Sequence, residues 1–133
     1  MEGLSELLRA HLLRPHGARP LPSAGEPLRV GIGNASNPPC GDELQLHLFC
    51  GSQGTLEPRF RARACSAVLA VASLCCETLA GKNFEQARAI DLAGEVEAAG
   101  GLPPQRRHAL AVVQRALDAA LDALAAAEAD PRG

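Results

Sequence analysis

The segment SAVLAVASLCCETLAG, residues 66–81, is apolar on nearly every side when it is drawn as a helix. A helix of this kind has to be enclosed, either in the core of a protein or in a membrane. A membrane span needs roughly 20 predominantly apolar residues, so this shorter segment predicts a helix buried in a protein core, with Gly81 at its end. The rest of the chain must supply the layers that cover it.

Three segments upstream of this helix alternate between apolar and polar or small residues, which is the period of a half-buried strand. They cover residues 28–32, 44–50 and 56–64, and the stretch 33–43 is expected to be a loop. Their apolar positions are Leu28, Val30 and Ile32, then Leu44, Leu46, Leu48 and Cys50, and finally Leu56, Phe60, Ala62 and Ala64. Short connections favour an antiparallel meander, whose apolar face the buried helix can cover.

Further helices are expected at both ends of the chain. Leucines at helical spacing predict a short helix over 4–13. Asn83 and Gln86 resemble a capping box that opens a helix ending at Ile90. The longest helix follows the prolines at 103–104. Its apolar stripe consists of Leu110, Val113, Leu117, Leu121 and Leu124.

The length of 133 residues is close to the usual size of one domain. Residues 20–27 have the composition of a connector, and the tail at 130–133 is expected to fray. The sequence therefore predicts a single α+β domain over residues 1–133, a three-stranded antiparallel sheet with helices packed on one face.

Charge and the N-terminal sequence exclude several classes of function. The chain carries 13 basic and 15 acidic residues, a formal net charge of −2, without the clustered basic excess that nucleic-acid binding requires. The start MEGLSELLRAHLLRPHG lacks the basic start, the uninterrupted apolar stretch and the cleavage site of a secretory signal. We therefore expect a cytoplasmic protein that binds neither nucleic acid nor membrane, with its five cysteines reduced rather than paired.

Cys40 and Asp42 stand together in the stiffest loop of the chain, where Pro38, Pro39 and Gly41 restrict the backbone. A cysteine that only fills space in a core does not need such a loop, whereas a ligand does. Aspartate is also a common turn residue that bonds its own backbone, so Asp42 alone has a structural explanation. The adjacent pair favours a binding role.

Cys65 and His108 are further candidates, each at the start of an expected helix. The unpaired amides and the dipole of a first helical turn stabilise anions, which favours the thiolate of Cys65. Cys65 can equally be a packing residue, and His108, about 160° around its helix from Leu110, can be a solvent-facing histidine. Together with Cys40 and Asp42 they provide two thiolates, one carboxylate and one imidazole, a set that suits tetrahedral zinc or an iron–sulfur cluster. No C-x-x-C or H-x-x-x-H pair supports the set, so the spacing alone is a weak signal.

The other cysteines and the arginines of the third strand have simpler explanations. Cys75 lies about 15 Å along the helix from Cys65 at about 1.5 Å per residue, so the two cannot share an ion. Cys75, Cys76 and Cys50 are expected in the core. The arginine row at 59–63 is either a docking face for an acidic partner or, more simply, a solvated outer face of the sheet.

Three blocks, NPPCGDELQL, FRARACSAVLAVASLCCETLAGK and LPPQRRHAL, resemble in order and spacing the motif blocks of the IscU/NifU-type (SufU-like) iron–sulfur cluster assembly scaffolds. The segment HLLRPHGARPLP is similar to the family's opening helix and its His-Tyr-x-x-Pro-Arg-Asn segment, without the tyrosine. The likeness covers nearly the whole chain. It implies an α+β domain with a small antiparallel sheet backed by helices. It also implies that Cys40, Asp42, Cys65 and His108 hold a cluster or zinc.

The resemblance implies a function that is not enzymatic by itself. A scaffold of this kind binds iron or a labile [2Fe-2S] cluster, or zinc, works with a cysteine desulfurase and passes the cluster to acceptor apo-proteins. One alternative is a zinc-bound sulfur-transfer partner of a cysteine desulfurase, with Cys40 or Cys65 as the acceptor. Another is a regulatory paralogue that keeps the fold and has lost cluster assembly.

The chain also departs from the family pattern. Ala109 stands where the family normally has a third cysteine, so one sulfur ligand is missing and the uptake of persulfide sulfur is in question. Ala64 replaces a glycine before Cys65. Gln105 and Arg106 replace the valine and lysine of the Leu-Pro-Pro-Val-Lys segment, which removes an apolar anchor and changes the cation. These changes count against docking of an Hsp70-type chaperone.

Overall fold

The structure is a computed structural model that describes residues 3–18, 29–51 and 53–129. The strands are β1 (Arg29–Asn37), β2 (Asp42–Cys50) and β3 (Leu56–Arg63). The helices are α1 (Glu6–Leu13), α2 (Ser66–Leu79), α3 (Phe84–Arg88), α4 (Leu92–Ala98) and α5 (His108–Ala129), with short 3-10 turns at Pro38–Cys40 and Pro104–Arg106. The predicted connector at 20–27, Leu28 and the tail at 130–133 lie outside the described residues.

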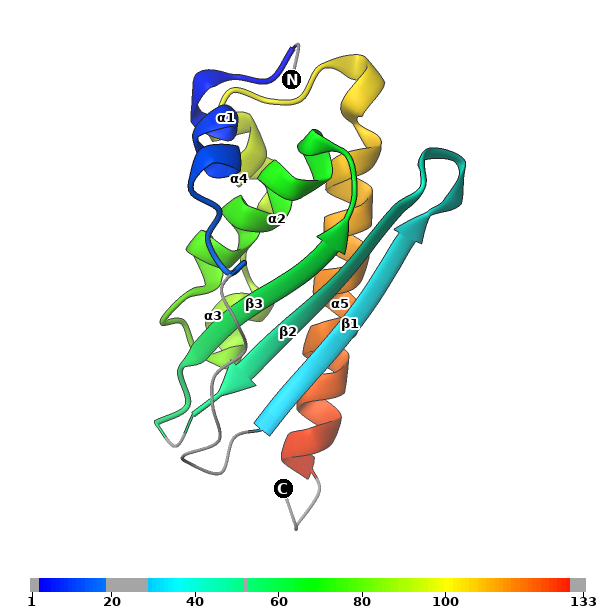
Figure 1. Cartoon of the computed structure of the whole chain (residues 1–133). Helices are drawn as coiled ribbons and strands as arrows, with labels where there is room; N and C mark the ends of the chain where they lie inside the picture. The colour runs from blue at the N-terminus through cyan, green and yellow to red at the C-terminus, as the bar shows by residue number, and fades with distance from the viewer. Residues whose placement is uncertain (1–2, 19–28, 52, 130–133) are drawn as a thin grey trace.

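The strands form one antiparallel sheet in the order β1, β2, β3, as predicted (Figure 1). β1 and β2 pair along their whole length, ending with Asn37 opposite Asp42. β1 is longer than predicted, and the loop expected over 33–43 shrinks to a tight turn. Asn34 and Ser36 keep the strand alternation and stay in register with β2, so pairing overrides their weak strand propensity.

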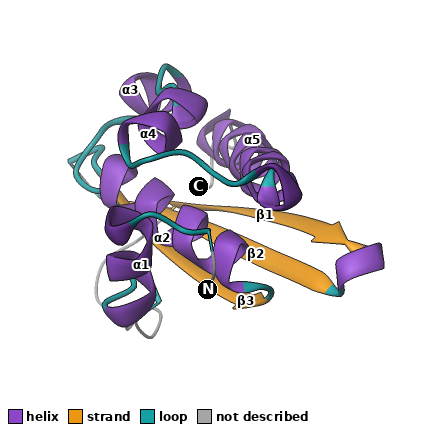
Figure 2. Cartoon of the chain, turned by 90° about the horizontal axis from the view of Figure 1, so that it is seen from above, coloured by secondary structure: helices purple, strands orange, loops and turns teal. Residues whose placement is uncertain are grey.

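α2 and α5 pack against one face of the sheet, which confirms the predicted α+β architecture (Figure 2). The inward side chains of β2 are at most 3% exposed; they are Leu44, Leu46, Leu48 and Cys50. α2 also contacts α1, α4 and α5. Because it is enclosed by the sheet and by these helices, most of its residues are buried, which explains why its sequence is apolar all round.

Glycine forms the inner face of β1 where α5 crosses it. Gly31 and Gly33 are buried, whereas Ile32 is 42% exposed on the opposite face. A Cβ atom at Gly33 would overlap main-chain atoms of Ala116 and Ala120. The prediction that Ile32 and the positions in phase with it form the core face of this strand is therefore wrong, because the α5 backbone approaches too closely for a side chain.

The outer face of the sheet is less solvated than predicted. His47 is 5% and Arg59 7% exposed. Arg59 donates to a main-chain carbonyl and to the carboxylate of Glu57, which offsets the burial of its charge. Burial lowers the pKa of His47, and the nearby charge of Arg61 lowers it further. Arg61 and Arg63 are exposed, as predicted.

The end of β3 lies at the margin of the core. Leu56 and Phe60 are buried, as predicted, whereas Ala62 is exposed and Ala64 is half-buried. The core therefore stops at Phe60 on this strand, and the alanines beyond it contribute little to packing.

The chain between α2 and α5 contains a helix that was not predicted. The capping box of Asn83 and Gln86 is present, as predicted, but its helix α3 already ends at Arg88. α4 follows, with the Asp91 carboxylate accepting from the N–H of Gly94. An aspartate N-cap before a short apolar pattern is a signal that the sequence does contain.

A buried histidine holds α1 on α2. His11 Nδ1 lies 2.6 Å from Ser73 Oγ, and its Nε2 lies 3.7 Å from the carboxylate of Glu77. Ser73 Oγ also accepts from the main-chain N–H of His16, so the segment after α1 is tied to the same point. Burial lowers the pKa of His11, with an opposing contribution from Glu77.

Within the three described ranges, every helix is too short or too polar to cross a bilayer.

Replacing Gly33 with alanine is expected to lower the free energy of unfolding by about 1–3 kcal/mol, because the added methyl group would displace α5. Gly51→Ala is the matched control, since a Cβ there meets no atom within 4 Å. Urea denaturation of both variants measures the difference. Equal stability of the two would contradict the close approach of α5 to β1.

Acidification is expected to destabilise the fold through His11. Because its pKa is lowered in the folded state, the unfolded chain binds the proton more readily. The contribution of the neutral His11 to the stability of the fold is fully present above the ordinary histidine pKa of about 6.5. It is lost as the pH falls below that value toward the lower pKa of the folded state. His11→Asn should flatten the dependence of Tm on pH over this acidic range, as differential scanning calorimetry can show. An unchanged slope in the variant would contradict this role.

Candidate metal centre

Three segments that are distant in sequence meet at one end of the sheet. They are the turn between β1 and β2, the junction of β3 with α2, and the start of α5, which lie toward the upper end of the view in Figure 1. Each contributes at least one of the four predicted ligands: Cys40, Asp42, Cys65 and His108.

The turn presents one exposed and one buried ligand. Pro38 and Pro39 open the 3-10 turn, and Gly41 closes it in the left-handed region with φ 71°. A residue with a side chain is strained in that conformation, so glycine is required there. Cys40 consequently stays exposed at the tip, while Asp42 turns inward and is 1% exposed.

Asp42 connects the other two segments. Its Oδ1 accepts a 2.8 Å hydrogen bond from the main-chain N–H of Cys65, the N-cap residue of α2. Its Oδ2 lies 3.2 Å from His108 Nε2, but the two atoms do not have hydrogen-bond geometry. Among the described residues Oδ2 therefore has no hydrogen-bond partner, although it is buried. A buried carboxylate oxygen in this state is an atom that a cation would satisfy.

The four candidate ligands are grouped, though not equally closely. One ligand atom from each of Cys40, Asp42 and His108 lies within 4.8 Å of the other two. Cys65 Sγ lies 3.6 Å from His108 Nε2 but is not part of that mutual set. The thiols, the carboxylate and the imidazole are donors that suit zinc or iron. That they bind a metal remains a prediction.

The other cysteines belong to the core, as predicted. Cys50, Cys75 and Cys76 are at most 2% exposed. Burial raises the pKa of Cys75 to about 12 and also raises the pKa of Cys76. Because thiolates rather than thiols bind metals, these two side chains do not compete with Cys40 and Cys65.

One function of Asp42 was not visible in the sequence. Its hydrogen bond to the Cys65 N–H spans 23 positions in the chain, and a turn aspartate gives no sign of its distant partner. Arg115 was missed for the same reason: from α5 it donates to the main-chain carbonyl of Ser36 and ties the end of β1 to the helix that carries His108.

Residues 10–130 match the family model of the NifU-like N terminal domain. The chain belongs to the NifU-like N-terminal domain family. The matched range includes all four candidate ligands, and the resemblance predicted from the motif blocks is confirmed.

Curated relatives support this membership. The chain is 34% identical over 96 residues to the iron-sulfur cluster assembly scaffold protein IscU of Escherichia coli strain K12, covering 69% of this chain and 72% of that protein. It is 33% identical over 78 residues to the scaffold protein IscU 1 of Archaeoglobus fulgidus, covering 59% of this chain and 51% of that protein. The chain thus spans about half the length of the Archaeoglobus relatives it matches.

A solved structure has the same fold. A protein of Fervidobacterium islandicum AW-1, assigned as an iron-sulfur cluster assembly scaffold for the SUF system, superimposes with a TM-score of 0.61. The match covers 88% of this chain and 95% of that chain at 18% identity. At this identity the likeness concerns the fold, which agrees with the predicted NifU-like domain.

Replacing Asp42 with asparagine is expected to weaken zinc binding by at least about tenfold, because it removes an anionic oxygen from the site. Asp118→Asn makes the same change of charge on the exposed surface of α5, where the carboxylate accepts from Gln114. Competition with a chromogenic chelator measures both affinities, and circular dichroism checks that both variants fold. Equal zinc affinity of the two variants would count against Asp42 as a ligand.

Proposed function

We propose that this chain is an iron–sulfur cluster assembly scaffold, in which iron or a labile [2Fe-2S] cluster is cargo that passes on to acceptor apo-proteins. The observation that carries the proposal is the buried Oδ2 of Asp42, which has no hydrogen-bond partner among the described residues and lies 3.2 Å from His108 Nε2. The similarity to the iron-sulfur cluster assembly scaffold proteins of E. coli and Archaeoglobus agrees with it.

The four candidate ligands would have different roles in binding the iron or the cluster. Asp42 is buried and His108 is half-buried, and they would provide the harder ligands, while the thiols of the exposed Cys40 and the half-buried Cys65 would provide the sulfur. Cys40 lies exposed on the turn and gives solvent and partners access to the cargo. Two thiolates with two harder ligands hold a cluster less tightly than four thiolates, which suits temporary binding.

The chain has alanine at the position of the family's third cysteine, so the proposed site has two sulfur ligands instead of three. Ala109 is fully buried next to His108, and its methyl group offers no donor. In this proposal the scaffold is one domain over residues 1–133 with two sulfur ligands, its partner is a cysteine desulfurase, and it catalyses no reaction by itself.

A second candidate function follows from the exposure of Cys40. In a zinc-bound sulfur-transfer protein, the Cys40 thiolate would attack the outer sulfur of a desulfurase cysteine persulfide. The sulfur–sulfur bond breaks, the desulfurase thiolate leaves, and the persulfide remains on Cys40. A persulfide adduct on intact protein by mass spectrometry, without cluster formation, favours this reading.

Anaerobic reconstitution with iron and sulfide tests the scaffold directly. The parent is expected to take up iron and to develop the visible absorbance of a cluster, whereas Cys40→Ser and Cys65→Ser should lose most of both. Cys50→Ala, which removes a core thiol outside the site, is the control and should behave like the parent. Parent-like cluster content in both serine variants would refute the ligand assignment. A parent that binds neither iron nor zinc would favour a regulatory paralogue.

A further inference from the structure

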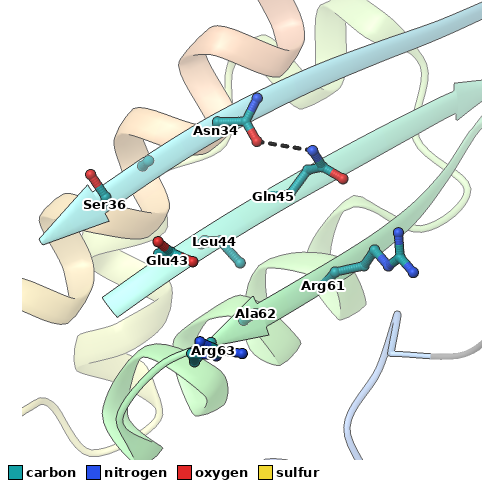
Figure 3. Close-up of a pocket in the computed structure, with 9 residues that line it drawn as sticks. Asn34, Ser36, Glu43, Leu44, Gln45, Arg61, Ala62 and Arg63 are labelled. Carbon is teal, nitrogen blue, oxygen red and sulfur yellow. Dashed lines mark hydrogen bonds between the residues drawn. The ribbon is translucent and has the colours of Figure 1, made fainter. Parts of the chain in front are cut away.

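The outer face of the sheet contains a groove toward the end that carries the candidate metal centre. Its volume is about 810 Å³, and it crosses all three strands (Figure 3). Its polar lining consists of Asn34, Ser36, Glu43, Gln45, Arg61 and Arg63. Because neighbouring strands lie about 4.8 Å apart, three strands give a floor about 10 Å wide, enough for an extended peptide.

The groove carries positive charge that the described part of the chain does not neutralise. Arg61 and Arg63 are exposed, and neither guanidinium has an ion pair among the described residues. The buried Arg59 on the same face is different, since its guanidinium pairs with Glu57 at 2.8 Å. Among the described residues Glu43 is the single acidic one on the lining, so this part of the groove has an excess of one positive charge, from two arginines against one glutamate.

The floor of the groove offers groups that can pair with a peptide main chain. Gln45 Nε2 donates a 3.0 Å hydrogen bond to Asn34 Oδ1, which fixes the two amides across β1 and β2 (Figure 3). Asn34 keeps its own N–H donors and Gln45 keeps its carbonyl oxygen. One amide can thus donate to a peptide carbonyl while the other accepts from a peptide N–H.

The groove lies at the same end of the sheet as the candidate metal centre, but on the opposite face from the buried Asp42. Glu43 follows the candidate ligand Asp42 directly, and Arg63 lies two positions before Cys65. Across β2 and β3, Glu43 is paired in register with Arg63, and Gln45 with Arg61. A chain bound along this floor would therefore reach the end of the sheet that carries the candidate ligands, on the opposite face.

We infer that this groove docks an extended acidic segment of a protein partner, with its carboxylates on Arg61 and Arg63. Arginine forms two parallel hydrogen bonds with a carboxylate, which fixes orientation as well as charge. Nucleic acid fits less well, because the described residues of the lining include no aromatic side chain on which a base could stack. That the partner exchanges iron or sulfur with this chain rests on the proposed function, whereas binding of the segment does not.

Fluorescence anisotropy with a labelled peptide of alternating glutamate and serine tests the inference. Arg61→Gln and Arg63→Gln should each weaken binding by about tenfold, and added salt should weaken binding to the parent. Arg9→Gln removes the same charge from the exposed surface of α1 and should leave the affinity unchanged. Circular dichroism confirms that the variants fold, which their exposed positions favour.

Three probes define the outcomes that overturn the inference. If a glutamine–serine peptide bound as tightly as the acidic peptide, charge would have no role in binding. If the Arg61 and Arg63 variants bound the acidic peptide as tightly as the Arg9 variant, the peptide would bind outside the groove. Tighter binding of a single-stranded oligonucleotide than of the acidic peptide would assign the groove to nucleic acid. Inorganic phosphate that displaces the peptide at low concentration would assign it to a small anion.

The same titration on Cys40→Ser separates this inference from the proposed function. That variant is expected to lose iron and to keep peptide binding, because Cys40 does not line the groove. Peptide binding without any cluster in the parent would leave the groove intact and refute the scaffold. Cluster assembly without peptide binding would refute the groove alone.

Discussion

The carboxylate of Asp42 is the interaction on which the candidate centre depends. One oxygen accepts a hydrogen bond from the N–H of Cys65, the N-cap residue of α2, and the other faces the imidazole of His108, the first residue of α5. A single buried side chain on a turn thus sets the relative position of two helix starts. Burying a carboxylate without a full set of partners costs free energy, and a cation bound between Asp42 and His108 would offset that cost.

The packing of α5 on the sheet positions the imidazole of His108 near Asp42. Gly31 and Gly33 let the α5 backbone lie directly on β1, and Arg115 ties the helix to the end of the same strand. Small residues far from the ligands therefore determine where His108 sits. Cys40 is exposed at the tip of its turn, so the centre combines a buried carboxylate with an accessible thiol.

The sequence predicts the architecture well because burial follows periodicity. The alternation at 44–50 and the continuous apolar run at 66–81 each permit one packing arrangement, and both are confirmed. β1 is the exception, because its inner face is built from glycine and its apolar residues Val30 and Ile32 lie on the other face. The burial of His47 and Arg59 was missed for a related reason, since polar residues at strand positions normally face water.

For the site, the sequence supplies the ligands but not their geometry. Motif blocks identify Cys40, Asp42, Cys65 and His108, while the Asp42 hydrogen bond and the groove arise only when distant segments meet. X-ray absorption spectroscopy of the zinc-loaded protein tests the centre most directly. A first shell with two sulfurs at about 2.3 Å and two nitrogen or oxygen atoms at about 2.0 Å is expected. A shell without sulfur, or one that is unchanged when Cys40 and Cys65 are both replaced by serine, would contradict a metal centre at this place.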